Sequence, residues 1–257
     1  MRRIKKCTVF LLLLCLLLNL AGCAAAQKPL RVTLVLKTVT EVAEFWGTLL
    51  SGVEKAAEEY GVELKVLTSP REIDIDKQIE LIRQVTADKP DVMILSAADY
   101  DRCAEATEEA IAAGIGVVAI DTDVNAAGRA CFVGSNSYEI GLEMGRAMAS
   151  YLPEGGKVAV IQHMLTTTTG IERTRGVLDA LNEAGNIEIL GSFCCDNSTE
   201  QAQTITTELL SADPEIRGFV CTNEVCNVGA ANALVELGMG GRVYVVGCDN
   251  SQRQIQF

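Results

Sequence analysis

The feature that most constrains this chain is a regular alternation of short apolar runs with segments of helical period. Nine runs of four to seven residues read as strands: 31–37, 62–67, 91–96, 116–121, 130–133, 157–162, 187–193, 218–221 and 243–247. Between them, apolar residues recur every three or four positions in 44–60, 75–87, 100–113, 137–151, 170–184, 198–211 and 228–237. This order predicts βαβ units with right-handed crossovers. The continuous apolar runs predict parallel sheets covered by helices on both faces.

Nine strands are too many for one compact sheet of ordinary size. The chain of 257 residues is long enough for two lobes, and Gly and Asn residues cluster at 123–135, where we expect the break. The predicted fold is α/β, with two Rossmann-like lobes at 30–133 and 134–257.

The first 22 residues have the pattern of an export signal. An apolar run at 9–18 follows a charged start and is too short to span a bilayer comfortably. The ending Leu20-Ala21-Gly22-Cys23 resembles a bacterial lipobox, so Cys23 is the expected lipidated first residue and 23–29 a short tether. A plain cleavage site after Gly22 and an uncleaved anchor are the alternatives. Removal of the four positive charges in the signal takes the net charge from −12 to −16.

Composition excludes several function classes. The acidic balance disfavours nucleic acid and anionic membrane surfaces as partners. His163 is the only histidine, so a multi-histidine metal site is impossible. No nucleotide-binding glycine loop follows the first strand, and no G-x-S-x-G elbow occurs. We therefore expect a binding protein without cofactor or metal, in which His163 is satisfied or adjacent to the ligand. An α/β enzyme is the alternative from a different class.

Seven cysteines remain after the signal and the lipidated residue. An odd number cannot all pair, and the adjacent Cys194 and Cys195 are poorly placed to bridge each other. Most of the seven lie in apolar runs, such as Cys131 and Cys221, and we interpret these as small buried hydrophobic residues. One disulfide bond among these cysteines is the alternative.

Polar residues gather where the predicted strands end. Asp, Asn, Thr and Ser follow most strands, and the aromatic residues Phe45 and Trp46 lie near the first. Ligands of open α/β sheets bind beyond the carboxyl ends of the strands. Carboxylates and amides there suit vicinal hydroxyl groups, and an aromatic ring can stack on the C–H face of a sugar. Such residues also serve as helix caps and turn formers.

The order of several motifs resembles one family. They include Lys89-Pro90-Asp91, Val133-Gly134-Ser135-Asn136, Glu172-Arg173-Thr174-Arg175-Gly176, Thr222-Asn223-Glu224 and Val246-Gly247-Cys248-Asp249-Asn250. Together they resemble the periplasmic binding proteins of the ribose/galactose type, with the type I fold, which serve sugar ABC transporters. Relative to ribose binders, Ala43-Glu44 replaces an Asn-Pro pair and Thr122 replaces an Arg. The family also continues beyond this chain's last residue, with a crossover back to the first lobe, so we expect an incomplete second lobe.

The resemblance implies a role for each of eight residues. Phe45 and Trp46 would sandwich the sugar ring, Asp121 would accept from its hydroxyls, and Arg173 would donate to its oxygens. From the second lobe, ligand contacts would come from Asn223, Asp249, and Asp196 or Asn197.

The implied mechanism is closure of a lipid-anchored monomer on a small sugar, about a hinge near 133–135, followed by delivery to an ABC transporter permease. A sensor of the same fold that feeds a chemoreceptor or sensor kinase is the alternative. A sugar-responsive transcription regulator would need an N-terminal DNA-binding helix pair, where this chain has a lipobox.

Overall fold

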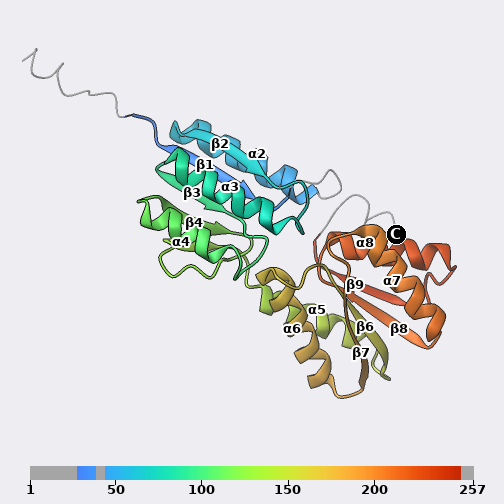
Figure 1. Cartoon of the computed structure of the whole chain (residues 1–257). Helices are drawn as coiled ribbons and strands as arrows, with labels where there is room; N and C mark the ends of the chain where they lie inside the picture. The colour runs from blue at the N-terminus through green and yellow to red at the C-terminus, as the bar shows by residue number, and fades with distance from the viewer. Residues whose placement is uncertain (1–27, 39–43, 250–257) are drawn as a thin grey trace, which may run out of the picture.

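A computed structural model describes residues 28–38 and 44–249 of the chain. Two parallel sheets form the centres of two lobes (Figure 1). The first has the strand order β2-β1-β3-β4-β5 and the second the order β7-β6-β8-β9. The α/β class, the nine strands and the parallel pairing predicted from the sequence are confirmed.

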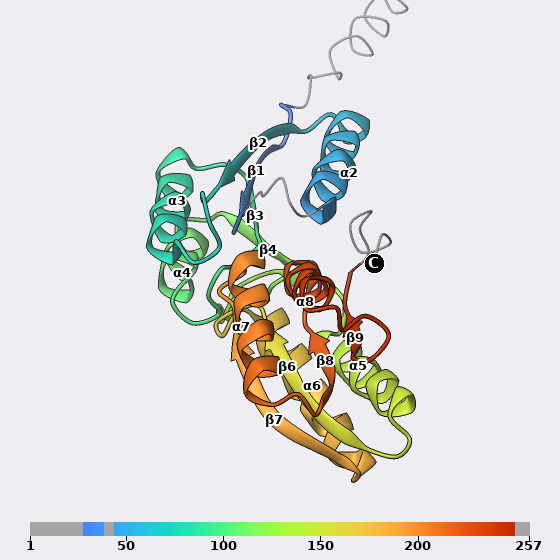
Figure 2. The same ribbon diagram turned by 90° about the vertical axis from the view of Figure 1, so that its right-hand side faces the viewer.

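The first sheet is covered by helices on both faces. Its elements in chain order are β1 (Arg31–Leu36), α2 (Glu44–Tyr60), β2 (Glu63–Thr68), α3 (Ile75–Asp88), β3 (Val92–Leu95), α4 (Ala104–Ala112), β4 (Gly116–Ile120) and β5 (Cys131–Val133). Figure 2 shows α2 on one side of this sheet and α3 and α4 on the other. Side chains along β1 alternate between the two helix layers. Val35 faces the core beneath α3 and α4, while Leu34 and Leu36 face α2.

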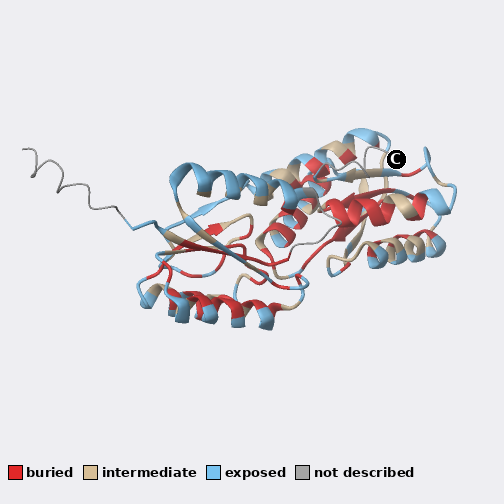
Figure 3. Cartoon of the chain, turned by 90° about the horizontal axis from the view of Figure 1, so that it is seen from above, coloured by how far each residue is buried: buried red, intermediate tan, exposed pale blue. Residues whose placement is uncertain are grey.

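The second sheet repeats this plan. Its elements are α5 (Ser137–Tyr151), β6 (Gly156–Gln162), α6 (Thr168–Ala184), β7 (Ile187–Cys194), α7 (Thr199–Ala212), β8 (Ile216–Cys221), α8 (Glu224–Glu236) and β9 (Tyr244–Gly247). Val158 and Val160 face α5 and α6, whereas Ala159 and Ile161 face α7 and α8. Buried residues therefore lie on the inner strands of the two sheets, and the outer helix faces are exposed (Figure 3).

Helix boundaries differ from the predicted ones where polar side chains set them. Helix α8 begins four residues earlier than predicted, because the Asn223 side chain accepts the backbone N–H of Cys226. Helix α4 begins four residues later, because the Asp99 side chain accepts the N–H groups of Asp101 and Arg102 and holds a turn there.

The cysteine prediction is correct for four residues and wrong for one. Cys103, Cys195, Cys221 and Cys226 are buried, and Cys194 and Cys248 are half-buried. Cys131 is exposed, because β5 is the edge strand of its sheet and, among the described strands, pairs with β4 alone. All seven are free thiols.

Candidate functional site

A polar cavity lies where the two lobes meet, at the carboxyl ends of their strands. Its volume is about 50 Å³. The first lobe contributes Lys37, Phe45, Trp46, Glu72 and Asp121. The second contributes His163, Thr169, Arg173, Asn197, Asn223, Glu224, Val225 and Asp249.

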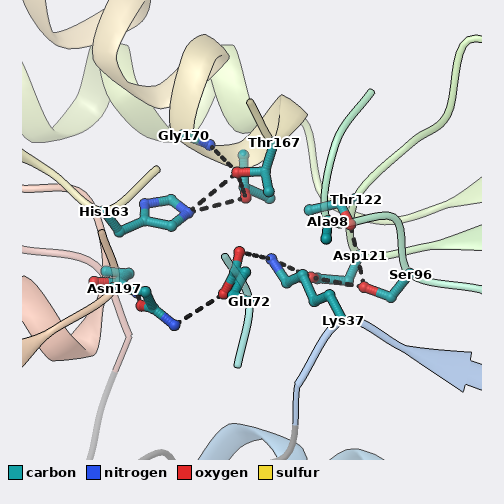
Figure 4. Close-up of polar contacts among 12 residues, drawn as sticks. Lys37, Glu72, Ser96, Ala98, Asp121, Thr122, His163, Thr167, Gly170 and Asn197 are labelled. Carbon is teal, nitrogen blue, oxygen red and sulfur yellow. Dashed lines mark hydrogen bonds and ion pairs between the residues drawn. The ribbon is translucent and has the colours of Figure 1, made fainter. Parts of the chain in front are cut away.

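An ion-pair network forms the first-lobe wall of this cavity. The Nζ atom of Lys37, which follows β1, lies 2.8 Å from Glu72 Oε1 and 3.4 Å from Asp121 Oδ2 (Figure 4). Lys37 and Glu72 are each only 4% exposed. Burial alone disfavours the charged form of Lys37, but the attraction of Glu72 and Asp121 exceeds this effect and raises the pKa of Lys37. The lysine is therefore a cation in the site.

Two asparagines extend this network from the second lobe. Asn197 Nδ2 donates to Glu72 Oε2 at 2.9 Å, so a hydrogen bond joins the two lobes inside the cavity. Asn223 Nδ2 donates to Asn197 Oδ1 at 2.8 Å, while Asn223 Oδ1 caps α8. Both amides are thus oriented by fixed partners before any ligand arrives.

Left-handed backbone bends present several of these side chains. The φ angles are +60° at Asp121, +54° at Asn197 and +73° at Asp249. Asp and Asn enter this region more readily than other residues that carry a Cβ atom. Such bends cluster at functional sites, where the surrounding structure holds them.

Arg173 supplies a cation from helix α6. It is 9% exposed, and its Nη1 donates to the carbonyl of Thr222 at 2.8 Å. Its Nε–H is buried without a hydrogen-bond partner among the described residues. A buried, unsatisfied donor at the cavity wall is suited to an oxygen acceptor on a ligand.

Close contact between α5 and α6 fixes the position of Arg173. A Cβ atom on Gly141 of α5 would lie 2.1 Å from the carbonyl oxygen of Arg173. A Cβ on Gly176 would likewise meet the backbone of Tyr138 at 2.2 Å. The two helices reach this separation only because glycine occupies both positions.

His163 is satisfied by hydrogen bonds, as predicted, and it lines the cavity. It follows β6 and is 2% exposed, with ring nitrogens 2.8 Å from Thr222 Oγ1 and 3.2 Å from Thr169 Oγ1. Burial, with the nearby charges of Lys37 and Arg173, holds the pKa of His163 well below its usual range. The imidazole is therefore neutral in the folded protein.

The two aromatic residues do not form the expected sandwich. Their ring centroids lie 5.0 Å apart at an interplanar angle of 84°, so Phe45 and Trp46 contact each other edge to face. Trp46 is 5% exposed and packs on Leu34 and Leu36, whereas Phe45 is exposed. In this arrangement the two rings do not face each other across a gap, and the Lys37 ammonium lies 5.8 Å from the centroid of the Trp46 ring.

Seven of the eight predicted ligand residues line the cavity: Phe45, Trp46, Asp121, Arg173, Asn197, Asn223 and Asp249. The eighth, Asp196, is exposed and does not line it; its carboxylate accepts from the Cys194 thiol. Cys23, the predicted lipidation site, lies outside the described residues. Lys37, Glu72, Thr169 and Glu224 also line the cavity, and the sequence assigns no site role to them, although Glu224 belongs to the Thr222-Asn223-Glu224 motif.

Within residues 28–38 and 44–249, no group of His, Cys, Asp and Glu side chains is arranged to hold a metal ion. The same part of the chain contains no helix long and apolar enough to cross a membrane.

Several known proteins are similar to this chain in sequence or in structure. A D-ribose/D-allose-binding protein of Pseudomonas aeruginosa is 27% identical over 234 residues, which cover 88% of this chain and 72% of the relative. A D-allose-binding periplasmic protein of Escherichia coli is 26% identical, with 91% and 76% covered. An ABC transporter solute-binding protein of Actinobacillus succinogenes, solved with bound D-allose, is 28% identical with a TM-score of 0.80, over 89% of this chain and 81% of that one.

These relatives are sugar-binding transport proteins and not enzymes, in agreement with the enzyme motifs that the sequence lacks. The family model described as a periplasmic binding protein domain matches residues 33–257. Because that match extends over most of the chain, the protein belongs to the periplasmic binding protein domain family.

Proposed function

We propose that this chain captures a small neutral sugar between its two lobes and delivers it to the membrane permease of an ABC importer. The observation that carries the proposal is the cavity at the lobe junction, where oriented carboxylates, amides and a guanidinium from both lobes converge. These groups complement a ligand with several hydroxyls, each of which both donates and accepts hydrogen bonds. The names of the relatives favour a ribose-like or allose-like sugar.

Binding requires the lobes to separate. A cavity of about 50 Å³ is smaller than the several hundred Å³ of typical ligand sites. The contacts among Lys37, Glu72 and Asn197 fill the middle of the site. In the proposed cycle the lobes open about residues 133–135, sugar hydroxyls replace part of this network, and closure follows because the ligand contacts both lobes.

The site residues then take distinct roles. The free face of Phe45 stacks on the C–H face of the sugar, and Asp121 and Asp249 accept from its hydroxyls. Arg173, through its unsatisfied Nε–H, donates to a sugar oxygen. Asn197 and Asn223 contact the ligand from the second lobe, and Lys37 and Glu72 add a donor and an acceptor.

The proposal extends to cellular placement. Residues 1–22 direct export, Cys23 carries the lipid, and 23–29 tether a monomeric body of lobes 30–133 and 134–257 at the outer face of the membrane. Labelling with a fatty-acid precursor tests the anchor: wild-type protein incorporates the label and Cys23→Ala does not. Labelling of the variant would overturn the lipid assignment.

Calorimetry and thermal shift with D-ribose, D-allose and D-apiose test the binding function. We expect one of these sugars to raise Tm, and Asp121→Ala to weaken its binding at least 100-fold. Asp76→Asn, at a carboxylate that is 85% exposed, is the matched control and should bind normally. Failure of every sugar to bind a folded protein, or unchanged affinity in Asp121→Ala, would overturn the proposal.

A further inference from the structure

Two buried thiols face each other beneath the second-lobe wall of the cavity. The Sγ atoms of Cys195 and Cys226 lie 3.5 Å apart, and both side chains are 0% exposed. They belong to the apolar core between the second sheet and helices α7 and α8. Among the seven described cysteines, the contact between two sulfur atoms is the one between Cys195 and Cys226.

The backbone on each side of this pair is held in place. The N–H of Cys195 donates to the Gln162 carbonyl at 2.9 Å, and the Cys195 carbonyl accepts from Ser198 at 2.9 Å. Cys226 lies in the first turn of α8, where its N–H is capped by Asn223 at 3.0 Å. The two thiols therefore meet through native contacts, and a disulfide requires the sulfurs to approach from 3.5 Å to about 2.0 Å.

We propose that Cys195 and Cys226 are a disulfide site, oxidised by thiol–disulfide exchange with an external small-molecule or protein disulfide. The bridge would tie the turn that carries Asn197 to the start of α8 that carries Asn223, the two asparagines that are already joined by a 2.8 Å hydrogen bond. Oxidation thus locks the second-lobe wall of the cavity, a property separate from the proposed sugar binding.

The reaction balances as two successive exchanges. The Cys195 thiolate attacks one sulfur of the external disulfide, forms a mixed disulfide and releases one thiol. The Cys226 thiolate then attacks the Cys195 sulfur, which forms the internal bond and releases the second thiol. Two protein thiols lose two electrons and two protons, and the external disulfide is reduced to two thiols.

The environment favours Cys195 as the first nucleophile. A hydrogen bond from the Cys226 thiol lowers the pKa of Cys195, whereas burial and that same bond raise the pKa of Cys226. Cys195 also lies next to the exposed Asp196, so opening of a short surface turn gives an oxidant access.

Site-resolved alkylation tests the assignment on the full chain. Protein is equilibrated in buffers of increasing oxidised-to-reduced glutathione ratio and alkylated under denaturing conditions. It is then reduced, alkylated with a second reagent and sequenced by fragmentation mass spectrometry. We expect Cys195 and Cys226 to become oxidised together, before and to a greater extent than Cys103, Cys194 or Cys221. Oxidation of other pairs first, or no coupled oxidation of these two, would overturn the proposal.

Variants and melting curves supply the second readout. Oxidation should raise Tm by roughly 5–15 °C, reversibly with dithiothreitol. Cys194→Ala, adjacent to Cys195, and Cys221→Ala, at the end of β8 before α8, are matched controls and should keep this shift. Cys195→Ala and Cys226→Ala should abolish it. The pairing is contradicted if oxidation still raises Tm in Cys195→Ala or in Cys226→Ala. It is also contradicted if the rise in Tm disappears in both Cys194→Ala and Cys221→Ala.

Discussion

Asn197 of the second lobe and Glu72 of the first lobe are joined by a hydrogen bond of 2.9 Å inside the candidate site. Because Glu72 also pairs with Lys37 at 2.8 Å, one buried carboxylate connects the cation at the end of β1 to the opposite lobe. Two further hydrogen bonds join the lobes: Tyr100 N–H donates to the Thr166 carbonyl at 2.9 Å, and Thr166 Oγ1 donates to the Ala98 carbonyl at 3.0 Å. Polar contacts thus hold the lobes together, and a hydroxylated ligand can replace those that lie in the cavity.

Replacement of Lys37 by methionine should strongly destabilise the protein. The change leaves Glu72 and Asp121 beside each other without their cation, and loss of one partner of a buried pair costs about 3–5 kcal/mol. Urea unfolding at pH 7 measures the free energy of unfolding. Lys65→Met is the control, because the Lys65–Asp88 pair is 48% and 41% exposed and such pairs contribute about 1 kcal/mol or less. Equal losses in the two variants would contradict the role of the buried network.

Substitutions at the neighbouring Phe45 and Trp46 should separate an effect on sugar binding from an effect on protein stability. Trp46→Ala removes a buried ring from the α2 core and should cost about 3–5 kcal/mol of unfolding free energy. Phe45→Ala removes an exposed ring and should leave stability within about 1 kcal/mol. In sugar titrations, however, Phe45→Ala should reduce affinity. Unchanged affinity in this variant would remove Phe45 from the proposed site.

Glycine substitutions test how Arg173 is positioned. Gly141→Ala forces α5 away from the Arg173 backbone and should cost about 1–3 kcal/mol, with weaker ligand binding. Gly52→Ala, in exposed helix α2 with no atom near its added Cβ, should stabilise the protein by about 0.5–1 kcal/mol. Thermal melting of the two variants should therefore move Tm in opposite directions. An equal decrease in Tm for Gly141→Ala and Gly52→Ala would contradict the close contact between α5 and α6.

The single histidine predicts an acid-sensitive fold. The pKa of His163 is lowered in the folded state, so the unfolded chain takes up a proton at this residue more readily. The neutral His163 side chain therefore makes its full contribution to the free energy of unfolding above pH 6.5. As the pH falls below that value, the free energy of unfolding decreases by up to about 1.4 kcal/mol per pH unit.

Two measurements check this prediction. Because the chain has one histidine, one imidazole signal in the NMR spectrum reports its titration directly, and we expect a midpoint below 6.5. Urea unfolding between pH 7.5 and 5.5 should show a shallower pH dependence in His163→Gln than in wild type. A normal midpoint and identical slopes would contradict a buried neutral imidazole.

The strand tips explain how far the sequence could predict the site. Parallel strands bring their carboxyl ends to one edge, so Asp121, Asn223 and Asp249 could be grouped without knowledge of any contact. Arg173 lies within helix α6, and only the family resemblance points to it. Lys37 and Glu72 could not be grouped in this way, because buried lysine and glutamate are rare and these two are paired across 35 positions of sequence. The packing of Trp46 on Leu34 and Leu36 could not be predicted either, because a resemblance in sequence does not tell how far an aromatic ring near a site is buried in the core.

The left-handed bends at Asp121, Asn197 and Asp249 limit how this protein can acquire a new ligand preference. β-Branched and bulky residues resist such backbone angles, whereas Asn, Asp and Gly adopt them at little cost. Laboratory evolution should therefore exchange carboxylate for amide, or shorten the side chain, at these three corners. Larger alterations of specificity are expected at Arg173 of helix α6 and at Phe45 of helix α2, where the backbone is helical and accepts side chains of many shapes.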